Sequence, residues 1–337
     1  VGGFAGMQTG SSISDCTVSN LQKVTATKYA GGFTGVTRDA IVKGLLESLD
    51  ADLVPHLDKL NPSSNIVGCK VEGTELIVQS TGKYAGGFTG MAGNSSLSNS
   101  SVSGLTSVTA TDNYSGGFAG RATLGSGIIM AGKEEGDIQE TGLLGTATNL
   151  LKTVLAGDCD TQLLNLVGIS ATEMEGCSVS GTNFEIEAAQ YAGGLIGQGD
   201  GVIIRAFVSN NSETESTSTA NNIDGIGAVS ATNYAGGVAG QMLPANGSGV
   251  LDGVLSIANV LPFSLENINV IAGENGFAIT TDEEYAGGAI GQATGGTIEQ
   301  VTLTNIKQVT AKNYAGGFVG YAGPGSILES GGLNILG

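Results

Sequence analysis

Short runs in which apolar and polar residues alternate recur along most of the chain, bounded by Gly, Asn, Ser or Asp. The first clear runs are Ser14–Asn20 and Val24–Thr27, both rich in β-branched residues. Alternation with a period of two places every second side chain on one face of a β-strand, and the bounding residues favour tight turns. The pattern therefore predicts short strands joined by turns.

A seven-residue motif sets the spacing of these runs. It reads Tyr-Ala-Gly-Gly-Phe-Thr-Gly at Tyr29–Gly35, and a copy without the tyrosine opens the chain at Val1–Gly6. Further copies begin at Tyr84, Tyr114, Tyr191, Tyr234, Tyr285 and Tyr314. The shortest spacings, 30 residues from Tyr84 to Tyr114 and 29 from Tyr285 to Tyr314, define a bare coil. Self-similarity at such a period is typical of a solenoid.

Aligning the copies on the motif places similar apolar residues in the same slot of each coil. One slot holds Ile13, Ile66, Leu97, Met174, Ile203 and Ile298, and a second holds Val18, Val71, Val102, Val179, Val208 and Leu303. Equivalent strands of successive coils would stack at about 4.8 Å, the spacing of paired strands. We therefore expect an all-β solenoid. It would be one domain over residues 1–337, a right-handed parallel β-helix of about eight coils with three strands per coil.

Three insertions lengthen the coils, at residues 36–65, 121–172 and 243–264. Within them, apolar residues recur at helical spacing, and we expect the insertions to be helical and to lie on one side of the solenoid. The helical segments are predicted at Arg38–Leu49, Leu53–Leu60, Thr146–Ala156 and Val250–Leu261. A milder expansion at Ser212–Gly227 is polar and predicts an exposed loop.

Alternation within the motif places Tyr29, Gly31 and Phe33 on one face of the strand. Stacking the copies then predicts an aromatic ladder with glycine gaps. Its tyrosines are Tyr29, Tyr84, Tyr114, Tyr191, Tyr234, Tyr285 and Tyr314. We interpret these rings mainly as packing, and the alternative is a surface on which carbohydrate stacks.

The charge and composition restrict the classes of function. The formal net charge is −18 with 13 Lys and Arg, which argues against nucleic acid and against anionic membrane surfaces. No apolar run is long enough for a membrane helix. A chain that is 40 % hydrophobic, rich in Ser, Thr, Asn and Gly and free of Trp suits an extracellular or cell-surface β-protein. Because the chain starts inside a motif, we expect it to be a segment of a longer protein.

Three of the four cysteines, Cys16, Cys69 and Cys177, share one slot of the strand that follows the motif. Cys16 and Cys69 belong to consecutive coils, so their Cα atoms would be close enough for a disulfide. Cys159 lies in the second insertion and is the partner left for Cys177. The predicted pairs are Cys16–Cys69 and Cys159–Cys177, and the alternative is buried free thiols. No C-x-x-C pair occurs, so no zinc site is expected.

Catalytic chemistry has little support in the sequence. The single histidine is His56, in the first insertion. The carboxylate groups that could act in pairs do not recur in one column of adjacent coils; they are Asp50/Asp52, Asp158/Asp160 and Asp282/Glu283/Glu284. We expect no enzyme activity and no cofactor, apart from weak binding of calcium at Asp158 and Asp160.

The motif copies, such as Tyr29–Gly35 and Tyr314–Gly320, resemble the Gly-Gly-(Leu/Phe)-x-Gly repeats of large bacterial surface proteins, the GLUG-type repeats. The resemblance extends over the whole chain through its eight motif copies. It implies surface display, a role as stalk or adhesin, and no catalytic residues. The helical insertions depart from simple arrays of this repeat.

These observations predict a non-catalytic structural module: a stalk, adhesin or filament segment of a larger extracellular protein. Its partners would be other copies or neighbouring segments of the same protein, bound through the coil ends, since solenoids need capped ends. Two alternatives stay open: a glycan-binding β-helix that uses the aromatic ladder, and a polysaccharide-degrading β-helix enzyme.

Overall fold

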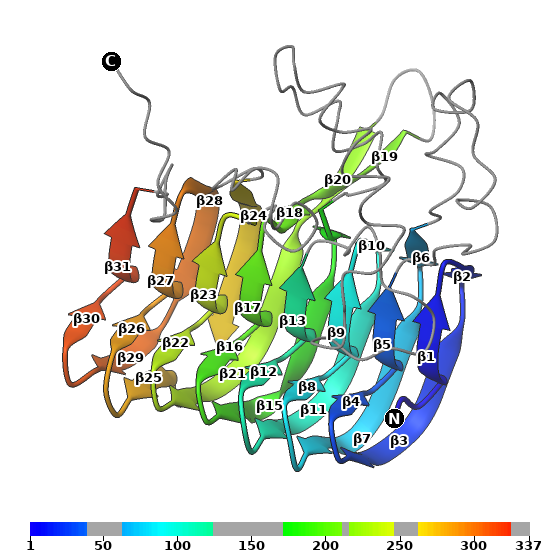
Figure 1. Ribbon diagram of the computed structural model, residues 1–337, viewed down its shortest axis with the longest axis horizontal. Helices are drawn as coiled ribbons and strands as arrows, with labels where there is room; N and C mark the ends of the chain where they lie inside the picture. The colour runs from blue at the N-terminus through cyan, green and yellow to red at the C-terminus, as the bar shows by residue number, and fades with distance from the viewer. Residues whose placement is uncertain (39–62, 124–170, 211–215, 246–261, 325–337) are drawn as a thin grey trace, which may run out of the picture.

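The computed structural model describes residues 1–38, 63–123, 171–210, 216–245 and 262–324, and these residues form strands and turns without a helix. Figure 1 shows the strands side by side along the long axis of the molecule. Three sheets of parallel strands account for all strands except one hairpin. The predicted all-β fold with parallel sheets is confirmed, and it is the arrangement of a β-solenoid. The handedness and the number of coils stay predictions.

The motif supplies one strand to each of two sheets. A seven-stranded sheet contains β4 (Tyr29–Gly31), β8 (Tyr84–Gly86), β12 (Tyr114–Gly116), β16 (Tyr191–Gly193), β22 (Tyr234–Gly236), β26 (Tyr285–Gly287) and β30 (Tyr314–Gly316). An eight-stranded sheet contains β1 (Ala5–Thr9), β5 (Thr34–Arg38), β9 (Thr89–Gly93), β13 (Ala119–Thr123), β17 (Ile196–Asp200), β23 (Ala239–Leu243), β27 (Ile290–Thr294) and β31 (Val319–Gly323).

A fourteen-stranded sheet closes each coil. Short strands lead each coil into it: β2 (Ser12–Ser14), β6 (Ser64–Val67), β10 (Ser95–Ser98), β14 (Glu173–Glu175) and β18 (Ile203–Arg205). Longer strands follow them: β3 (Thr17–Ala26), β7 (Lys70–Ser80), β11 (Ser101–Ala110), β15 (Ser178–Ala188) and β21 (Asn221–Ala231). The last two coils contribute β24 (Phe263–Ala272), β25 (Phe277–Thr281), β28 (Gly296–Thr304) and β29 (Ile306–Thr310).

The predicted division of a coil into three strands is wrong at two places. The motif bends between β4 and β5, because glycine allows a close approach there: a Cβ on Gly31 would lie 1.9 Å from the carbonyl oxygen of Thr34. Conversely, the two runs after the motif merge into the single strand β3. An irregularity around Leu21, next to Asn20 with a φ of 58°, shifts the pairing with β7 by one residue between the two runs.

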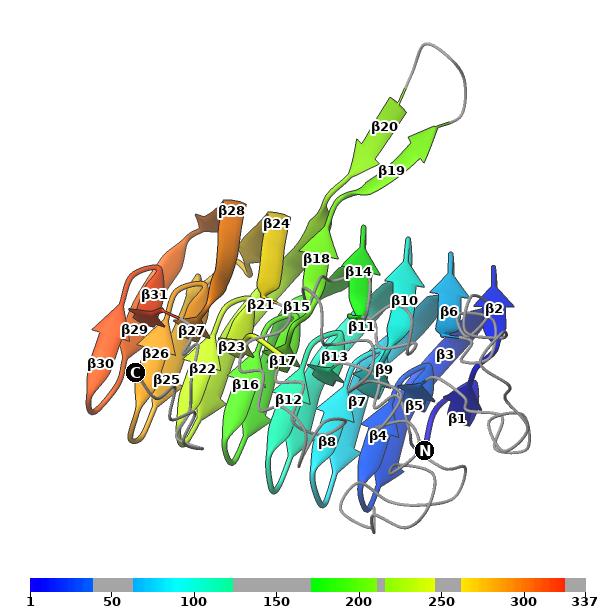
Figure 2. The ribbon, with the colours of Figure 1, turned by 45° about the horizontal axis from the view of Figure 1, so that its top comes forward.

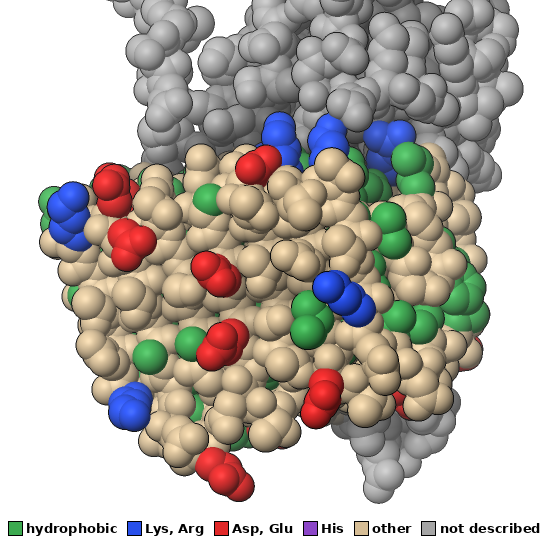
Figure 3. Space-filling view, turned by 90° about the horizontal axis from the view of Figure 1, so that it is seen from below, with side chains coloured by type: hydrophobic (Ala, Val, Ile, Leu, Met, Phe, Trp, Pro, Cys, Tyr) green, Lys and Arg blue, Asp and Glu red, His purple; other side chains and the backbone are tan. Residues whose placement is uncertain are grey.

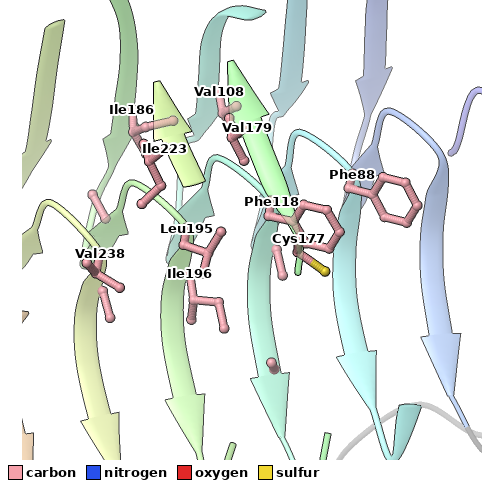
Figure 4. Close-up of a cluster of buried hydrophobic side chains, with 14 of the residues drawn as sticks. Phe88, Val108, Phe118, Cys177, Val179, Ile186, Leu195, Ile196, Ile223 and Val238 are labelled. Carbon is pink, nitrogen blue, oxygen red and sulfur yellow. The ribbon is translucent and has the colours of Figure 1, made fainter. Parts of the chain in front are cut away.

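The interior is filled by side chains that stack in columns from coil to coil. Both predicted columns are present, and each has one predicted residue replaced by another. The first column is Ile13, Ile66, Leu97, Met174, Ile204, Leu265 and Ile298. The second is Val18, Val71, Val102, Val179, Ile223, Val270 and Leu303. Ile204 replaces the predicted Ile203 because two adjacent isoleucines leave the phase of the alternation open. Figure 4 shows part of this core, with Val179, Ile186 and Ile223 among the buried side chains.

The prediction that Val208 belongs to the second column is wrong, because this residue lies on a hairpin outside the solenoid. Strands β19 (Phe207–Asn210) and β20 (Ser216–Thr219) pair antiparallel and project from the body, as Figure 2 shows. Val208 is 53 % exposed there. The exposed loop predicted at Ser212–Gly227 is also wrong, because β20 and most of β21 fall within it and Ile223 and Ile226 are fully buried.

The three predicted insertions connect the same two sheets at the same place in the coil. They leave after β5, β13 and β23 of the eight-stranded sheet and return at β6, β14 and β24 of the fourteen-stranded sheet. Their predicted limits are too wide by a few residues, since Val36–Arg38, for example, belongs to β5. Except for Arg38, the predicted helical segments lie outside the described residues.

Candidate functional site: the tyrosine ladder

The seven motif tyrosines form one continuous stack along the seven-stranded sheet. Each pairs in register with the tyrosine of the next coil, from Tyr29 with Tyr84 to Tyr285 with Tyr314. Neighbouring ring centroids are 4.8–5.6 Å apart, and neighbouring ring planes are inclined by 3–22°. Each inner ring therefore has its two faces covered by other rings, and its edge and hydroxyl remain for other contacts.

The phenylalanines of the motif form a separate stack inside the solenoid, so the predicted mixed ladder of Tyr and Phe on one face is wrong. Phe4, Phe33, Phe88 and Phe118 stack with centroids 4.6–4.9 Å apart. Phe33, Phe88 and Phe118 are fully buried. The bend at the two motif glycines rotates the chain between tyrosine and phenylalanine, so strict alternation does not carry across it.

Burial of the tyrosines varies along the ladder. Tyr84 is buried at 3 % exposure, and Tyr314 in the last coil is 55 % exposed. The other five rings are half-buried. The ladder is therefore a partly covered surface feature for most of its length and opens fully only at Tyr314.

A row of polar side chains runs beside the ladder, and sequence reasoning missed it. Its members, here called the polar row, directly follow the last glycine of four motif copies: Arg121, Gln198, Gln241 and Gln292. The Nε2 of Gln198 donates to the Oε1 of Gln241 at 2.6 Å, and Gln241 donates likewise to Gln292. The guanidinium of Arg121 lies 5.3 Å from the centre of the Tyr114 ring, which brings row and ladder together. The repeated position after the motif was the signal that could have found the row.

Burial raises the pKa of three phenols in the ladder. Burial first, and then the neighbouring phenols Tyr114 and Tyr234, raise the pKa of Tyr191 to about 12. Burial, with the nearby Glu284, also raises the pKa of Tyr234 and of Tyr285. At neutral pH the hydroxyls of these three rings are thus neutral. Gln198 and Gln241 beside them are only 6 % exposed and bond to each other, so contacts with a neutral polar ligand would fall to the half-buried rings.

The cysteines stack in one column as predicted. Cys16, Cys69 and Cys177 are free thiols in this structure. The Sγ of Cys69 lies 3.5 Å from the backbone nitrogen of Cys16, and Ser100 occupies the slot between Cys69 and Cys177. Adjacency thus favours only the pair Cys16–Cys69. Cys159 lies outside the described residues, so the pair Cys159–Cys177 stays a prediction.

Of the predicted carboxylate groups, Asp282/Glu283/Glu284 lies among the described residues. Asp282 and Glu283 are exposed in one bend, and Glu283 lies 4.0 Å from Lys312. Asp50, Asp52, Asp158, Asp160 and His56 lie outside the described residues. Within the described ranges no group of three or more His, Cys, Asp or Glu could hold a metal ion, and no helix there could cross a membrane. In Figure 3 acidic side chains are scattered over a mostly uncharged face and form no single patch.

The repeat of this chain matches a known family model. Residues 1–25 match the family model of the GLUG motif. The chain carries a GLUG-type repeat. The matched GLUG segment covers the bend of the first coil, β1, β2 and most of β3, so one GLUG unit corresponds to most of one turn of this solenoid. The predicted resemblance is confirmed, and the GLUG motif suggests a repeat module of a surface protein. No curated protein and no solved structure matches the chain.

Proposed function

We propose that this chain is a non-catalytic structural module of an extracellular surface protein, acting as a stalk or adhesive segment. The observation that carries the proposal is the single core. Each coil pairs with the next in three sheets, and the apolar columns continue from the first coil to the last. Such a body holds its two ends at a fixed distance, about 35 Å across the eight-stranded sheet. The matched GLUG motif agrees with surface display.

Labelling of intact source cells with antibodies against this chain tests the proposal. We expect labelling at the cell surface and loss of the label after brief protease treatment of intact cells. Labelling only after the cells are broken open would refute surface display. A separate assay uses the purified chain and a panel of polysaccharides. Hydrolysis of any of them would contradict the non-catalytic role.

Glycan binding is the second candidate, and the half-buried tyrosines of the ladder favour it, because each keeps a ring edge and a hydroxyl outside the stack. Since ring faces are covered by neighbouring rings, and since Gln198 and Gln241 are only 6 % exposed, we propose recognition through ring edges and phenolic hydroxyls and not through stacking along the ladder. A glycan array with the purified chain tests this idea. Binding that is lost in Tyr234→Phe and retained in Val208→Ala would support it, and an array without binding would contradict it.

A further inference from the structure

One tyrosine outside the motif reaches the ladder from the neighbouring sheet. Tyr321 belongs to β31 and pairs in register with Gln292 of β27, so it occupies the slot of the polar row in its own coil. Its ring centroid lies 5.3 Å from that of Tyr285 in the preceding coil. Tyr285 therefore contacts three other rings, which are those of Tyr234, Tyr314 and Tyr321.

The inclination of the Tyr321 ring distinguishes this contact from those of the stack. Along the ladder, neighbouring ring planes are inclined by 3–22°, so the rings lie face to face. The planes of Tyr285 and Tyr321 are inclined by 47°. Rings that lie face to face keep their edges apart, whereas inclined rings bring an edge of one toward the other. A bond between two ring carbons needs the inclined arrangement.

A glycine on the same strand leaves room for the Tyr321 ring. A Cβ on Gly323 would lie 2.9 Å from both Cε1 and the hydroxyl oxygen of Tyr321. Residues two apart on a strand share one face, and here the ring lies over the glycine. A larger side chain at position 323 would push the ring aside. The local sequence thus contributes to the placement of the Tyr321 ring beside Tyr285.

A carboxylate lies close to the Tyr285 phenol. Glu284 directly precedes Tyr285, and both side chains are half-buried. Burial first, and then the charge of Glu284, raise the pKa of Tyr285. A phenol that loses an electron also gives up its proton, and a nearby carboxylate is a group that can accept it. The site therefore holds two phenols in contact and a proton acceptor beside one of them.

We propose that Tyr285 and Tyr321 form a site of oxidative cross-linking, at which a haem peroxidase with hydrogen peroxide joins the two rings as dityrosine. Each phenol gives up one electron and one proton, and the two radicals form a carbon–carbon bond between positions ortho to the hydroxyls. The hydrogen on each bonded carbon then moves to the oxygen, which restores both phenols. Hydrogen peroxide takes up the two electrons and two protons and becomes two molecules of water. The bond would fasten two successive coils to each other, which goes beyond the proposed structural role.

Oxidation of the 337-residue chain by a haem peroxidase and hydrogen peroxide tests the proposal. Ruthenium-sensitised photo-oxidation with persulfate serves as a second oxidant of smaller size. We expect dityrosine fluorescence in a chain that stays a monomer on a denaturing gel. Cleavage after glutamate places Tyr285 in the peptide 285–299 and Tyr321 in the peptide 300–329. The two peptides should be recovered as one species, two hydrogen atoms lighter than their sum.

Two matched variants distinguish the inclined neighbour from the stacked one. Tyr314 and Tyr321 lie almost equally far from Tyr285, at 5.2 and 5.3 Å, but their ring planes are inclined to it by 14° and 47°. Tyr321→Phe keeps the ring and removes the hydroxyl, so the joined peptides should be lost. Tyr314→Phe should retain them. Gly323→Ala should lower their yield, because the added Cβ displaces the Tyr321 ring.

Three results would overturn the proposal: joined peptides that persist in Tyr321→Phe, cross-links between chains only, or oxidation by both reagents that joins no peptides. Circular dichroism before oxidation checks that each variant is folded, and the wild-type peptide map tests the proposal even where a variant is not. Surface labelling of cells does not depend on this bond, so the proposed function and the cross-linking site fail separately.

Discussion

At the scale of single residues, the motif is defined by the close approach of its glycines to the backbone of the neighbouring coil more than by its side chains. Gly117 shows this in the middle of the array: a Cβ there would lie 2.1 Å from the carbonyl oxygen of Gly194 in the next coil. Glycine normally weakens a strand through its conformational entropy. Here that cost is offset because close approach lets the bend place phenylalanine inside and tyrosine outside.

Substitution of Gly117 by alanine should therefore destabilise the fold. We expect the free energy of unfolding to fall by about 1–3 kcal/mol, the usual cost of overpacking. Gly317→Ala is the matched control in the same slot, with nothing within 4 Å of the added Cβ, and should change the monomer by less than about 0.5 kcal/mol. Urea unfolding of both variants is the measurement, and equal losses would show that the close approach does not cause the destabilisation.

The tyrosine ladder predicts a loss of stability in alkaline solution. The pKa of Tyr191 is raised to about 12 in the folded chain, above the 10.0 of an ordinary tyrosine. Stability from this phenol is fully present below pH 10, and it is lost as the pH rises toward 12, because the unfolded chain releases the proton first. The melting temperature should fall over this window, and Tyr191→Phe should fall less. Identical profiles for variant and wild type would contradict the assignment.

The cysteine column predicts one disulfide under oxidising conditions. We expect Cys16 and Cys69 to be bonded, because they are neighbours in the column and Cys16 is partly exposed to an oxidant. Cys177 should stay reduced, since burial raises its pKa to about 12 and Ser100 separates it from Cys69. Peptide mass mapping without reductant is the measurement. The bond closes a loop of 53 residues, for which chain entropy predicts roughly 4 kcal/mol of stabilisation.

At the scale of elements, a coil tolerates an insertion at a corner because the strands before and after that corner keep their pairing with the neighbouring coil. Arg205 pairs with Glu175, and Asn222 pairs with Ser178, so the fifteen residues 206–220 replace the single Gly176 of the preceding coil. Gly176 has a φ of +59°, a left-handed conformation that turns the chain at this corner. The hairpin β19–β20 is thus an addition to the coil and not a part of it.

Replacing residues 206–220 by one glycine should leave the solenoid intact. We expect cooperative unfolding with a free energy within about 0.5 kcal/mol of the wild type, or slightly higher because a loop is shortened. Circular dichroism and thermal melting measure this. Loss of the β-sheet signal would mean that the hairpin helps to hold β18 and β21 in register.

At the scale of the whole molecule, the acidic residues that give the chain its negative charge lie mostly outside the first coil and the last described coil. The first coil, residues 1–28, has Lys23 and Lys28 against Asp15, and the last described coil, residues 296–324, has Lys307 and Lys312 against Glu299. The whole acidic excess behind the net charge of −18 thus lies outside these coils. Each of these two coils thus has a formal charge of +1 within an acidic chain.

The sequence by itself determined the period, the parallel all-β solenoid and most of the stacked slots. The reason is local: side chains alternate within a strand, and identical slots of a repeat must stack, so Val18, Val71 and Val102 could be aligned without coordinates. The polar row is also visible in the sequence, because its residues follow the last glycine of four motif copies. The alternation of apolar and polar residues did not point to it.

Only the tertiary structure decided where alternation stops. The bend at Gly31 and Gly32 sends Phe33 inward and leaves Tyr29 outside, and the hairpin before β21 gives the second column Ile223 in place of Val208. Both outcomes depend on contacts between coils, which are distant in sequence, so no pattern within one coil could fix them.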